Sequence, residues 1–400
     1  MLQKILWGAI VFQTSMPCVA QTLEPFLING KIKYGNLRTI YLAPIIFDKK
    51  YYFAKTQDSS QIVNHAFFFN GMLPYPHPFK LYYKDTDSGI ETDTEMFFVE
   101  NGNQVIRVDS ITEGLHITIN NCASNDEFLL SYLPEMKPYG TAWEKCFDRI
   151  DSVSNHYNGK APDSVMTLLR ADEERKKYEL DVFLLNYVRK HPTSYVALWK
   201  LVQKFSVLGY TPLYSQIYNC FSPALKKTPT GRELGKALKA ASQTAVGKIF
   251  PNLPLTDTKN VKLNLAAAQN GKAFVLLDFW YSHCAPCIAQ FQQLKTIYRE
   301  FEPFGLEIIC ISTDSQNDEK NWLTAINKNQ LPWKNFWDIG GVETKKLSIN
   351  SFPTNFLLDS NGKVIQRNID PFQLNLLLRN NFSLNSNRLS VFLKYRTDGK

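Results

Sequence analysis

The sequence predicts three structured parts: a small antiparallel β domain, a helical segment and a C-terminal α/β domain. Short β-branched and aromatic runs separated by turn residues occupy residues 21–125, whereas hydrophobic side chains recur every three or four residues over 126–245. Near-continuous apolar runs then alternate with amphipathic stretches over residues 246–383. The composition of the 400 residues, 44% hydrophobic and 20% charged, is ordinary for a globular protein. A chain of this length is expected to hold two or three domains.

The charge of the chain does not indicate a nucleic-acid partner. The formal net charge is +8, but Lys and Arg are scattered among acidic residues. Short basic runs such as Arg175–Lys177 are expected on solvated faces, because nucleic-acid binding requires a continuous basic stripe.

Residues 1–20 are predicted to be a secretory signal peptide. Lys4 precedes a short apolar stretch, and Ala20 offers a small residue at the cleavage position. The stretch is too short to span a bilayer, so no stable membrane span is expected. Lipidation at Cys18 is the alternative, which the preceding proline disfavours. We therefore expect a protein exported to the periplasm or cell envelope, where disulfides can form.

The β domain expected over residues 21–125 is a small sandwich or barrel. Its strand-like runs are residues 26–32, 40–42, 67–69, 81–83, 96–99, 105–108 and 115–119. We expect turns at Asn70-Gly71 and Asn101-Gly102, since Asn-Gly is a strong hairpin signal.

The helical segment expected over residues 126–245 shows helix-start signals as well as periodicity. Ser194 is a candidate N-cap, and Pro212 is expected at the first position of the next helix. Residues 251–263 are expected to be a linker into the last domain.

In the α/β domain, residues 273–279 and 306–311 are expected to be strands buried on both faces, each followed by an amphipathic helix. A hairpin is expected around Asp359–Gly362. These elements make a small mixed sheet, after which residues 384–400 are expected to form a C-terminal tail.

Seven cysteines are present, and removal of the signal peptide leaves six. Cys310 lies within an apolar run and is expected to be a small buried hydrophobe. A bridge between Cys122 and Cys146 is open, because spacing cannot establish connectivity.

Cys284 and Cys287 form a C-x-x-C motif at a strand-to-helix junction, which is typical of a redox couple. Cys284 precedes the helix, where the dipole and free N–H groups favour a thiolate, so it is expected to attack. Cys287 lies one turn further, within reach of the mixed disulfide. Pro286 stands in the first turn, where its missing N–H costs nothing. A protonated His283 would lower the pKa of the Cys284 thiol, or His283 is simply a surface residue; both interpretations stay open.

Other roles for the motif receive less support. No second C-x-x-C or His pair follows at zinc-ligand spacing, and Ile288 rather than His follows the second cysteine, which disfavours haem attachment. We expect no metal and no cofactor. A structural disulfide is the remaining alternative.

These motifs together resemble the thioredoxin fold, and specifically the TlpA/ResA-like thiol–disulfide oxidoreductases of the alkyl hydroperoxide reductase/thiol-specific antioxidant superfamily. The resemblance covers about residues 247–380 and is carried by Leu277–Trp280, Cys284, Cys287, Ile311–Asp314, Trp322, Trp333–Phe336 and Phe352–Asp359. The upstream residues resemble, more loosely, the β-rich domain of unknown function that precedes such modules in envelope proteins.

The resemblance implies roles for two further residues. Pro353 would follow a cis peptide bond beside the disulfide and expose backbone to an incoming chain. Asp278 would be a buried carboxylate beneath the resolving cysteine, where it helps to move the proton of that thiol. Burial would raise the pKa of Asp278 toward working pH; a solvated strand end is the alternative.

The sequence departs from the family at three positions. His283 stands where Trp is usual, Ala285 where Gly is common, and Gln292 where the helix usually has a proline. None removes a catalytic group, but such neighbours tune the reduction potential.

The sequence therefore predicts a cell-envelope enzyme that exchanges disulfides with protein substrates, as a reductant, and draws electrons from an unidentified envelope donor. An antioxidant peroxidase is the first alternative, although Asp278, Tyr281 and Ser282 do not supply the peroxide-binding motif upstream of Cys284. A non-catalytic envelope binding protein, with residues 21–245 as its working part, is the second.

Overall fold

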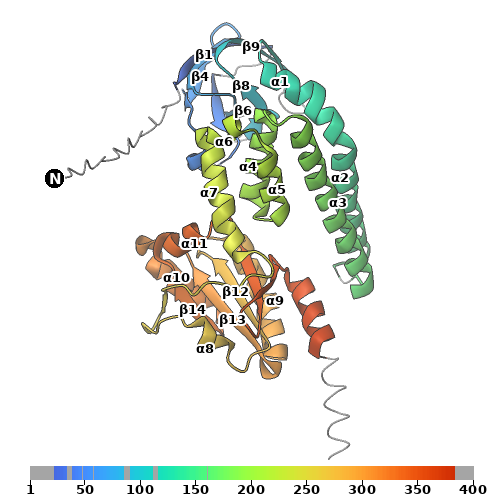
Figure 1. Cartoon of the computed structure of the whole chain (residues 1–400), viewed down its shortest axis with the longest axis vertical. Helices are drawn as coiled ribbons and strands as arrows, with labels where there is room; N and C mark the ends of the chain where they lie inside the picture. The colour runs from blue at the N-terminus through green and yellow to red at the C-terminus, as the bar shows by residue number, and fades with distance from the viewer. Residues whose placement is uncertain are drawn as a thin grey trace, which may run out of the picture.

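The computed structural model describes residues 22–33, 38–46, 48–56, 58–84, 91–110, 116–159 and 161–382. The predicted signal peptide and the predicted tail of residues 384–400 lie outside these ranges. Figure 1 shows the N-terminal strands, drawn in blue, at one end of the molecule and the C-terminal unit, in orange and red, at the other.

The N-terminal strands form two sheets. The strands are β1 (Glu24–Ile32), β2 (Thr39–Pro44), β3 (Lys55–Thr56), β4 (Ser59–Gln61), β5 (Ala66–Leu73), β6 (His77–Lys84), β7 (Glu91–Asp93), β8 (Phe97–Val99), β9 (Gly102–Ser110) and β10 (His116–Asn120). The sheet orders are β10-β9-β1-β5-β3 and β4-β2-β6-β7, with β8 also paired to β6. Most pairs are antiparallel as expected, but β1 and β9 are parallel. The chain between them passes through the second sheet, which lets β9 return in the direction of β1.

Alternation of side chains along β1 places its apolar residues in the core. Phe26, Ile28 and Ile32 are at most 3% exposed, while Asn29 and Lys31 face outward. Each such burial contributes about 1.5–3 kcal/mol.

Asn70-Gly71 lies inside β5, so the turn expected there is wrong. A Cβ on Gly71 would stand 2.3 Å from the Lys55 carbonyl oxygen of β3 and 2.6 Å from Phe26 Cε1 of β1. Glycine is therefore required for close approach within the sheet rather than for a turn.

The helical part follows the strands. Its helices are α1 (Ala123–Glu127), the π-helical turn η2 (Phe128–Tyr132), α2 (Leu133–His156), α3 (Asp163–Lys190), α4 (Tyr195–Leu208), α5 (Pro212–Cys220), α6 (Pro223–Lys227) and α7 (Pro229–Ala241). Ser194 caps α4 as expected, because its Oγ accepts a hydrogen bond from Ala197 N at 2.9 Å. No helix within the described ranges is both long and apolar enough to cross a membrane.

The strands and these helices share one hydrophobic core. The Trp199 indole N–H donates to the Pro76 carbonyl oxygen at 2.9 Å, and Tyr75 Oη lies 2.8 Å from Thr230 Oγ1. The β domain and the helical segment are therefore packed as one unit.

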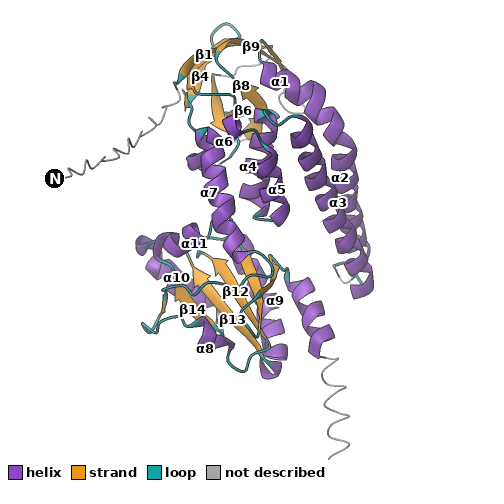
Figure 2. Ribbon diagram, viewed as in Figure 1, coloured by secondary structure: helices purple, strands orange, loops and turns teal. Residues whose placement is uncertain are grey.

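The C-terminal unit contains one six-stranded mixed sheet, shown in orange in Figure 2 with helices on its faces. Its elements are β11 (Thr256–Asp257), α8 (Leu265–Gln269), β12 (Phe274–Trp280), α9 (Ala285–Phe301), β13 (Leu306–Ser312), α10 (Glu319–Asn329), β14 (Lys334–Trp337), α11 (Val342–Lys346), β15 (Thr354–Asp359), β16 (Val364–Arg367) and a helix over residues 371–382. The order is β11-β14-β13-β12-β15-β16, with β12, β13 and β14 parallel. The predicted hairpin is confirmed by the antiparallel pair β15–β16.

Two separate apolar layers cover this sheet. Side chains from α9, α10 and the last helix pack on one face, and residues from the segment before β12, together with Leu347 and Ile349 after α11, pack on the other. The strands β12 and β13 are buried on both faces, as their continuous apolar runs predict.

Residues 251–263, expected as a linker, are part of the C-terminal unit. Leu253, Leu255 and Leu263 are buried against the sheet, and β11 pairs with β14. Their three leucines cover apolar strand surface, which a solvated linker would leave exposed.

The two ends of α3 offer a matched test of this packing. Leu184 is fully buried, whereas Leu168 is 73% exposed. We expect Leu184→Ala to lower the free energy of unfolding by about 2–5 kcal/mol, and Leu168→Ala to change it by less than about 0.5 kcal/mol. Urea unfolding followed by circular dichroism measures both, and equal losses would contradict the described core.

Candidate redox site

The two cysteines of the motif meet at the junction between β12 and α9. They form a disulfide with a Cα–Cα distance of 5.3 Å, and both are at most 2% exposed. Cys284 is the N-cap of α9, and its Sγ accepts a hydrogen bond from Cys287 N at 3.2 Å. A reduced Cys284 therefore has a helix amide and the positive end of the helix dipole to stabilise its thiolate. Pro286 occupies the first turn of α9, where no backbone donor is lost.

The loop before β15 reaches the same place. The Phe352–Pro353 peptide bond is cis, and the next residue, Thr354, pairs with Phe279 near the end of β12. The Phe352 ring packs edge-on against Tyr281, with ring centroids 5.6 Å apart. Pro353 is thus held beside the loop that carries Cys284.

Asp278 lies inside the unit, on the sheet face covered by α9. Leu276 and Trp280, its neighbours at i−2 and i+2, pack in that layer with Cys284 and Cys287, and side chains two apart on a strand share a face. Asp278 is 2% exposed. Burial raises its pKa to about 7, and a hydrogen bond from the Cys310 thiol acts in the opposite direction. The solvated-strand-end alternative is therefore wrong.

Asp314 organises the loop before the dithiol, a role that the sequence pattern did not predict. Its carboxylate accepts hydrogen bonds from Ser282 N (2.9 Å), Ser282 Oγ (2.6 Å) and Ser312 Oγ (2.6 Å). It follows β13, the parallel neighbour of β12. The sequence signal for Asp314 is its position just beyond the end of β13, a buried strand that neighbours the strand leading to the motif.

His283 is exposed and contacts residues at the start of α10. Its side chain is 65% exposed, and its Nε2 lies 3.7 Å from Asp318 Oδ1 and 3.2 Å from Asn321 Nδ2. The structure thus joins Cys284 to Cys287, places Asp278 on the sheet face covered by α9 and Pro353 next to a residue that packs on Tyr281. It directs His283 to the start of α10.

The other cysteines of the described ranges are free. Cys122 and Cys146 are both buried and unbridged, so the bridge left open by the sequence is not formed. Cys122 Sγ instead donates to the Phe98 carbonyl oxygen at 3.2 Å. Within the described ranges, no group of three or more His, Cys, Asp or Glu side chains could hold a metal ion.

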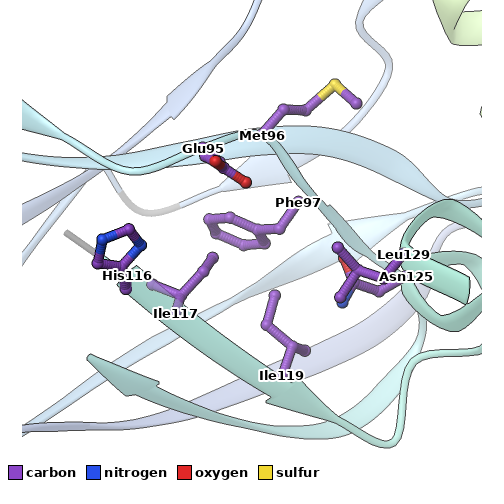
Figure 3. A pocket seen from close by; sticks show the side chains of 8 residues that line it. All are labelled: Glu95, Met96, Phe97, His116, Ile117, Ile119, Asn125 and Leu129. Atoms are coloured by element: carbon purple, nitrogen blue, oxygen red, sulfur yellow. The ribbon is translucent and has the colours of Figure 1, made fainter. Parts of the chain in front are cut away.

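The N-terminal part contains a small cavity of about 80 Å³ beside β8 and β10. Figure 3 shows Phe97, Ile117 and Ile119 around it, with Glu95 and His116 among its lining residues. Most of these lining residues are apolar and none is a cysteine, so the cavity is not a second site for thiol–disulfide exchange.

Comparison with known proteins agrees with this geometry. Residues 246–367 match the AhpC/TSA family, and residues 26–128 match a domain of unknown function, DUF4369. The chain is 33% identical over 122 residues to the thiol-disulfide oxidoreductase ResA of Bacillus thuringiensis subsp. konkukian, covering 30% of this chain and 68% of that protein.

Two solved structures are similar to the C-terminal unit. A thiol-disulfide oxidoreductase from Bacteroides fragilis NCTC 9343 is 31% identical and covers 33% of this chain and 98% of that one, with a TM-score of 0.31. The C-terminal domain of a putative thiol-disulfide oxidoreductase from Bacteroides thetaiotaomicron is 27% identical and covers 34% and 96%, with a TM-score of 0.32. At these scores the family assignment rests on the sequence relationships. The chain belongs to the AhpC/TSA family, as a ResA-like thiol–disulfide oxidoreductase whose thioredoxin fold follows an N-terminal DUF4369 domain.

Proposed function

We propose that the protein is exported to the cell envelope and there reduces disulfides of protein substrates through Cys284 and Cys287. The observation that carries this proposal is a pair of sulfurs at the first turn of α9, close enough to bond to each other, with Cys284 Sγ held by a helix amide. The ResA relatives support the reaction class, and the signal-like pattern of residues 1–20 supports export.

In the proposed cycle, the Cys284 thiolate attacks a substrate disulfide, forms a mixed disulfide and releases one substrate thiolate. Cys287 then loses its proton and attacks Cys284 Sγ, which breaks the mixed disulfide and releases the second thiolate. Two electrons pass from the protein dithiol to the substrate, and each released thiolate takes up a proton. An envelope electron donor restores the dithiol by the reverse exchange.

Asp278 is proposed to accept the proton of Cys287. Its carboxyl lies in the same buried layer, and burial brings its pKa to about 7, where the group changes charge near neutral pH. An ordinary exposed carboxylate would be too weak a base for this transfer.

Pro353 is proposed to present backbone to the substrate chain. The edge-on contact between Phe352 and Tyr281 holds this loop beside the segment that leads to Cys284. Tyr281 is 37% exposed, so an aromatic surface borders the proposed substrate position.

Substitution of the two motif cysteines separates their roles. We expect Cys284→Ser to abolish reduction of insulin by the dithiothreitol-reduced protein, because the attacking sulfur is lost. Cys287→Ser should accumulate mixed disulfides, detectable by mass, because nothing resolves them. Cys220→Ser, at a partly exposed free cysteine, is the control and should retain wild-type turnover. A Cys284→Ser variant as active as the wild type would exclude the proposed mechanism.

Asp278→Asn should change both activity and the pH dependence of stability. The pKa of Asp278 is raised from 3.8 to about 7, so the folded protein keeps a proton that the unfolded chain releases between these values. The proton on Asp278 therefore stabilises the folded protein fully below about pH 4, and this stabilisation is lost as the pH rises to about 7. The variant should lack this loss. It should be more stable than the wild type at pH 8 by a few kcal/mol, because a tenfold difference in proton affinity corresponds to about 1.4 kcal/mol.

Urea unfolding at pH 4.5 and pH 8 measures this difference, and insulin reduction by the variant should fall about 100-fold or more. Asp148→Asn, at an exposed carboxylate of α2, is the matched control. Parallel stability profiles for wild type and Asp278→Asn would show that the carboxyl is not buried as described.

Export predicts a defined mature N-terminus. When the full chain is expressed with its native leader in a Gram-negative host, the periplasmic protein should begin at Gln21. Edman sequencing of that fraction measures this, and a product that stays in the cytoplasm with its N-terminal segment intact would contradict the proposal.

A further inference from the structure

The strand register places a thiol directly beside Asp278. Asp278 of β12 pairs with Cys310 of the parallel neighbour β13. Cys310 belongs to the apolar layer beneath α9, together with Ile308 two residues earlier. The side chains of Asp278 and Cys310 therefore lie on the sheet face that carries the dithiol, and Cys310 is not only a small buried hydrophobe.

Cys310 is held on two sides. Its Sγ lies 3.7 Å from Asp278 Oδ2, to which the thiol donates a hydrogen bond. The Trp333 indole Nε1–H donates to the same Sγ at 2.8 Å. Because the sulfur already accepts from the indole, its own proton is directed to the carboxyl. The pKa of the Cys310 thiol is raised well above its ordinary value by burial and the nearby carboxyl, so the thiol keeps its proton.

Trp333 itself is fixed by α9. It is 5% exposed, and its ring packs edge-on against Phe291 and Tyr298, with centroid distances of 6.3 and 5.7 Å. The helix that presents the two motif cysteines therefore also locks the indole that orients Cys310.

The other carboxyl oxygen of Asp278 is left unused. Oδ1 is buried and has no hydrogen-bond partner among the described residues. A buried acceptor without a partner is costly, and such an atom is the free position at which a proton can arrive. The hydrogen bond from Cys310 occupies only Oδ2.

We propose that Cys310, oriented by Trp333, is a positioning residue that engages Asp278 Oδ2 and leaves Oδ1 to take the proton of the resolving cysteine. This inference rests on the proposed function. The proton moves from Cys287 Sγ to Oδ1 while Cys287 forms its bond to Cys284 Sγ and the substrate thiolate leaves. Cys310 stays a reduced thiol throughout, and no electrons pass through it.

Burial sets the raised pKa of Asp278, and Cys310 is the neighbouring side chain that adjusts it. Among the described neighbours, Asn355 of β15 is neutral and its side-chain amide bonds the Ile369 backbone. Tyr298 of α9 is neutral as well, since burial raises its pKa to about 12. Among the described residues, the influences on the pKa of Asp278 are its burial, which raises it, and the hydrogen bond from Cys310, which lowers it. A donor that stabilises the carboxylate lowers its pKa, so removal of the Cys310 thiol should shift the ionisation of Asp278 to higher pH.

The test follows the resolving step alone. In a Cys220→Ser background, the reduced mature protein, which begins at Gln21 and so lacks Cys18, reacts with one equivalent of 5,5′-dithiobis(2-nitrobenzoate), which forms a mixed disulfide on Cys284. Attack by Cys287 then releases a second thionitrobenzoate, and its rate is recorded between pH 5 and pH 9. The variants are Cys310→Ala, Cys310→Ser, which keeps a donor, and Trp333→Phe, which removes the indole donor. Cys146→Ala, at another buried free cysteine, is the matched control.

We expect Cys310→Ala to raise the midpoint of the pH profile by about one unit, which corresponds to loss of one hydrogen bond to a charged group, and to slow release about tenfold below the midpoint. Cys310→Ser should restore the midpoint, Trp333→Phe should shift it in the same direction as Cys310→Ala by a smaller amount, and Cys146→Ala should leave it unchanged.

An unmoved midpoint in Cys310→Ala would overturn the inference. If Cys310→Ala does not fold, an unmoved midpoint in Trp333→Phe decides against it in the same way. A wild type that releases no second equivalent would instead overturn the proposed function.

Discussion

Burial of β12 on both faces is the constraint on which the redox site depends. This strand lies inside the six-stranded sheet, between β13 and β15, with an apolar layer on each side. Because its end is fixed, Cys284 is held as the N-cap of α9. The same burial removes water from Asp278, which moves its pKa to about 7. The other residues of the candidate site lie at the ends of the two neighbouring strands: Asp314 follows β13 and Pro353 precedes β15.

The sequence predicted this site to the extent that the site is local in the chain. The motif cysteines, Pro286 and the strand before them are contiguous, so periodicity and spacing were sufficient. The roles of Asp278 and Pro353 were predicted only from the family resemblance, because the residues next to them in the chain do not indicate which side chains they contact. The contact of Asp278 with Cys310 depends on the register of two parallel strands separated by a helix, and a one-residue slip would reverse the faces. The turn predicted at Asn70-Gly71 was wrong for a related reason. The Asn-Gly turn signal is local in the chain, whereas the close approach of Lys55 and Phe26 to Gly71 comes from neighbouring strands.

The N-terminal DUF4369 domain and the helices that follow are best understood as one body attached to the redox unit. One apolar core includes strand residues such as Ile28 and helix residues such as Leu184. The aromatic cluster of Tyr75, His77 and Trp199 joins β6 and its preceding loop to α4. Burial lowers the pKa of His77 to about 4, so this histidine is neutral at ordinary pH and serves the packing. The dithiol and its proton acceptor lie in a separate core, so the redox chemistry is built within the C-terminal unit alone.

The charges around the dithiol bear on the proposed reducing direction. An enzyme becomes a strong oxidant when its reduced form is stabilised by charge near the attacking thiolate. Here His283, the residue next to Cys284, is 65% exposed and lies against Asp318, so its side chain is placed in solvent beside a carboxylate. The remaining stabilisation comes from the helix N-terminus and the Cys287 amide. In addition, a buried Asp278 that becomes charged above about pH 7 adds a negative group to the side of the sheet that carries the two sulfurs, which disfavours a thiolate there. A thiolate stabilised only by the helix N-terminus, with no cationic side chain against it, is in line with the proposed role as a reductant.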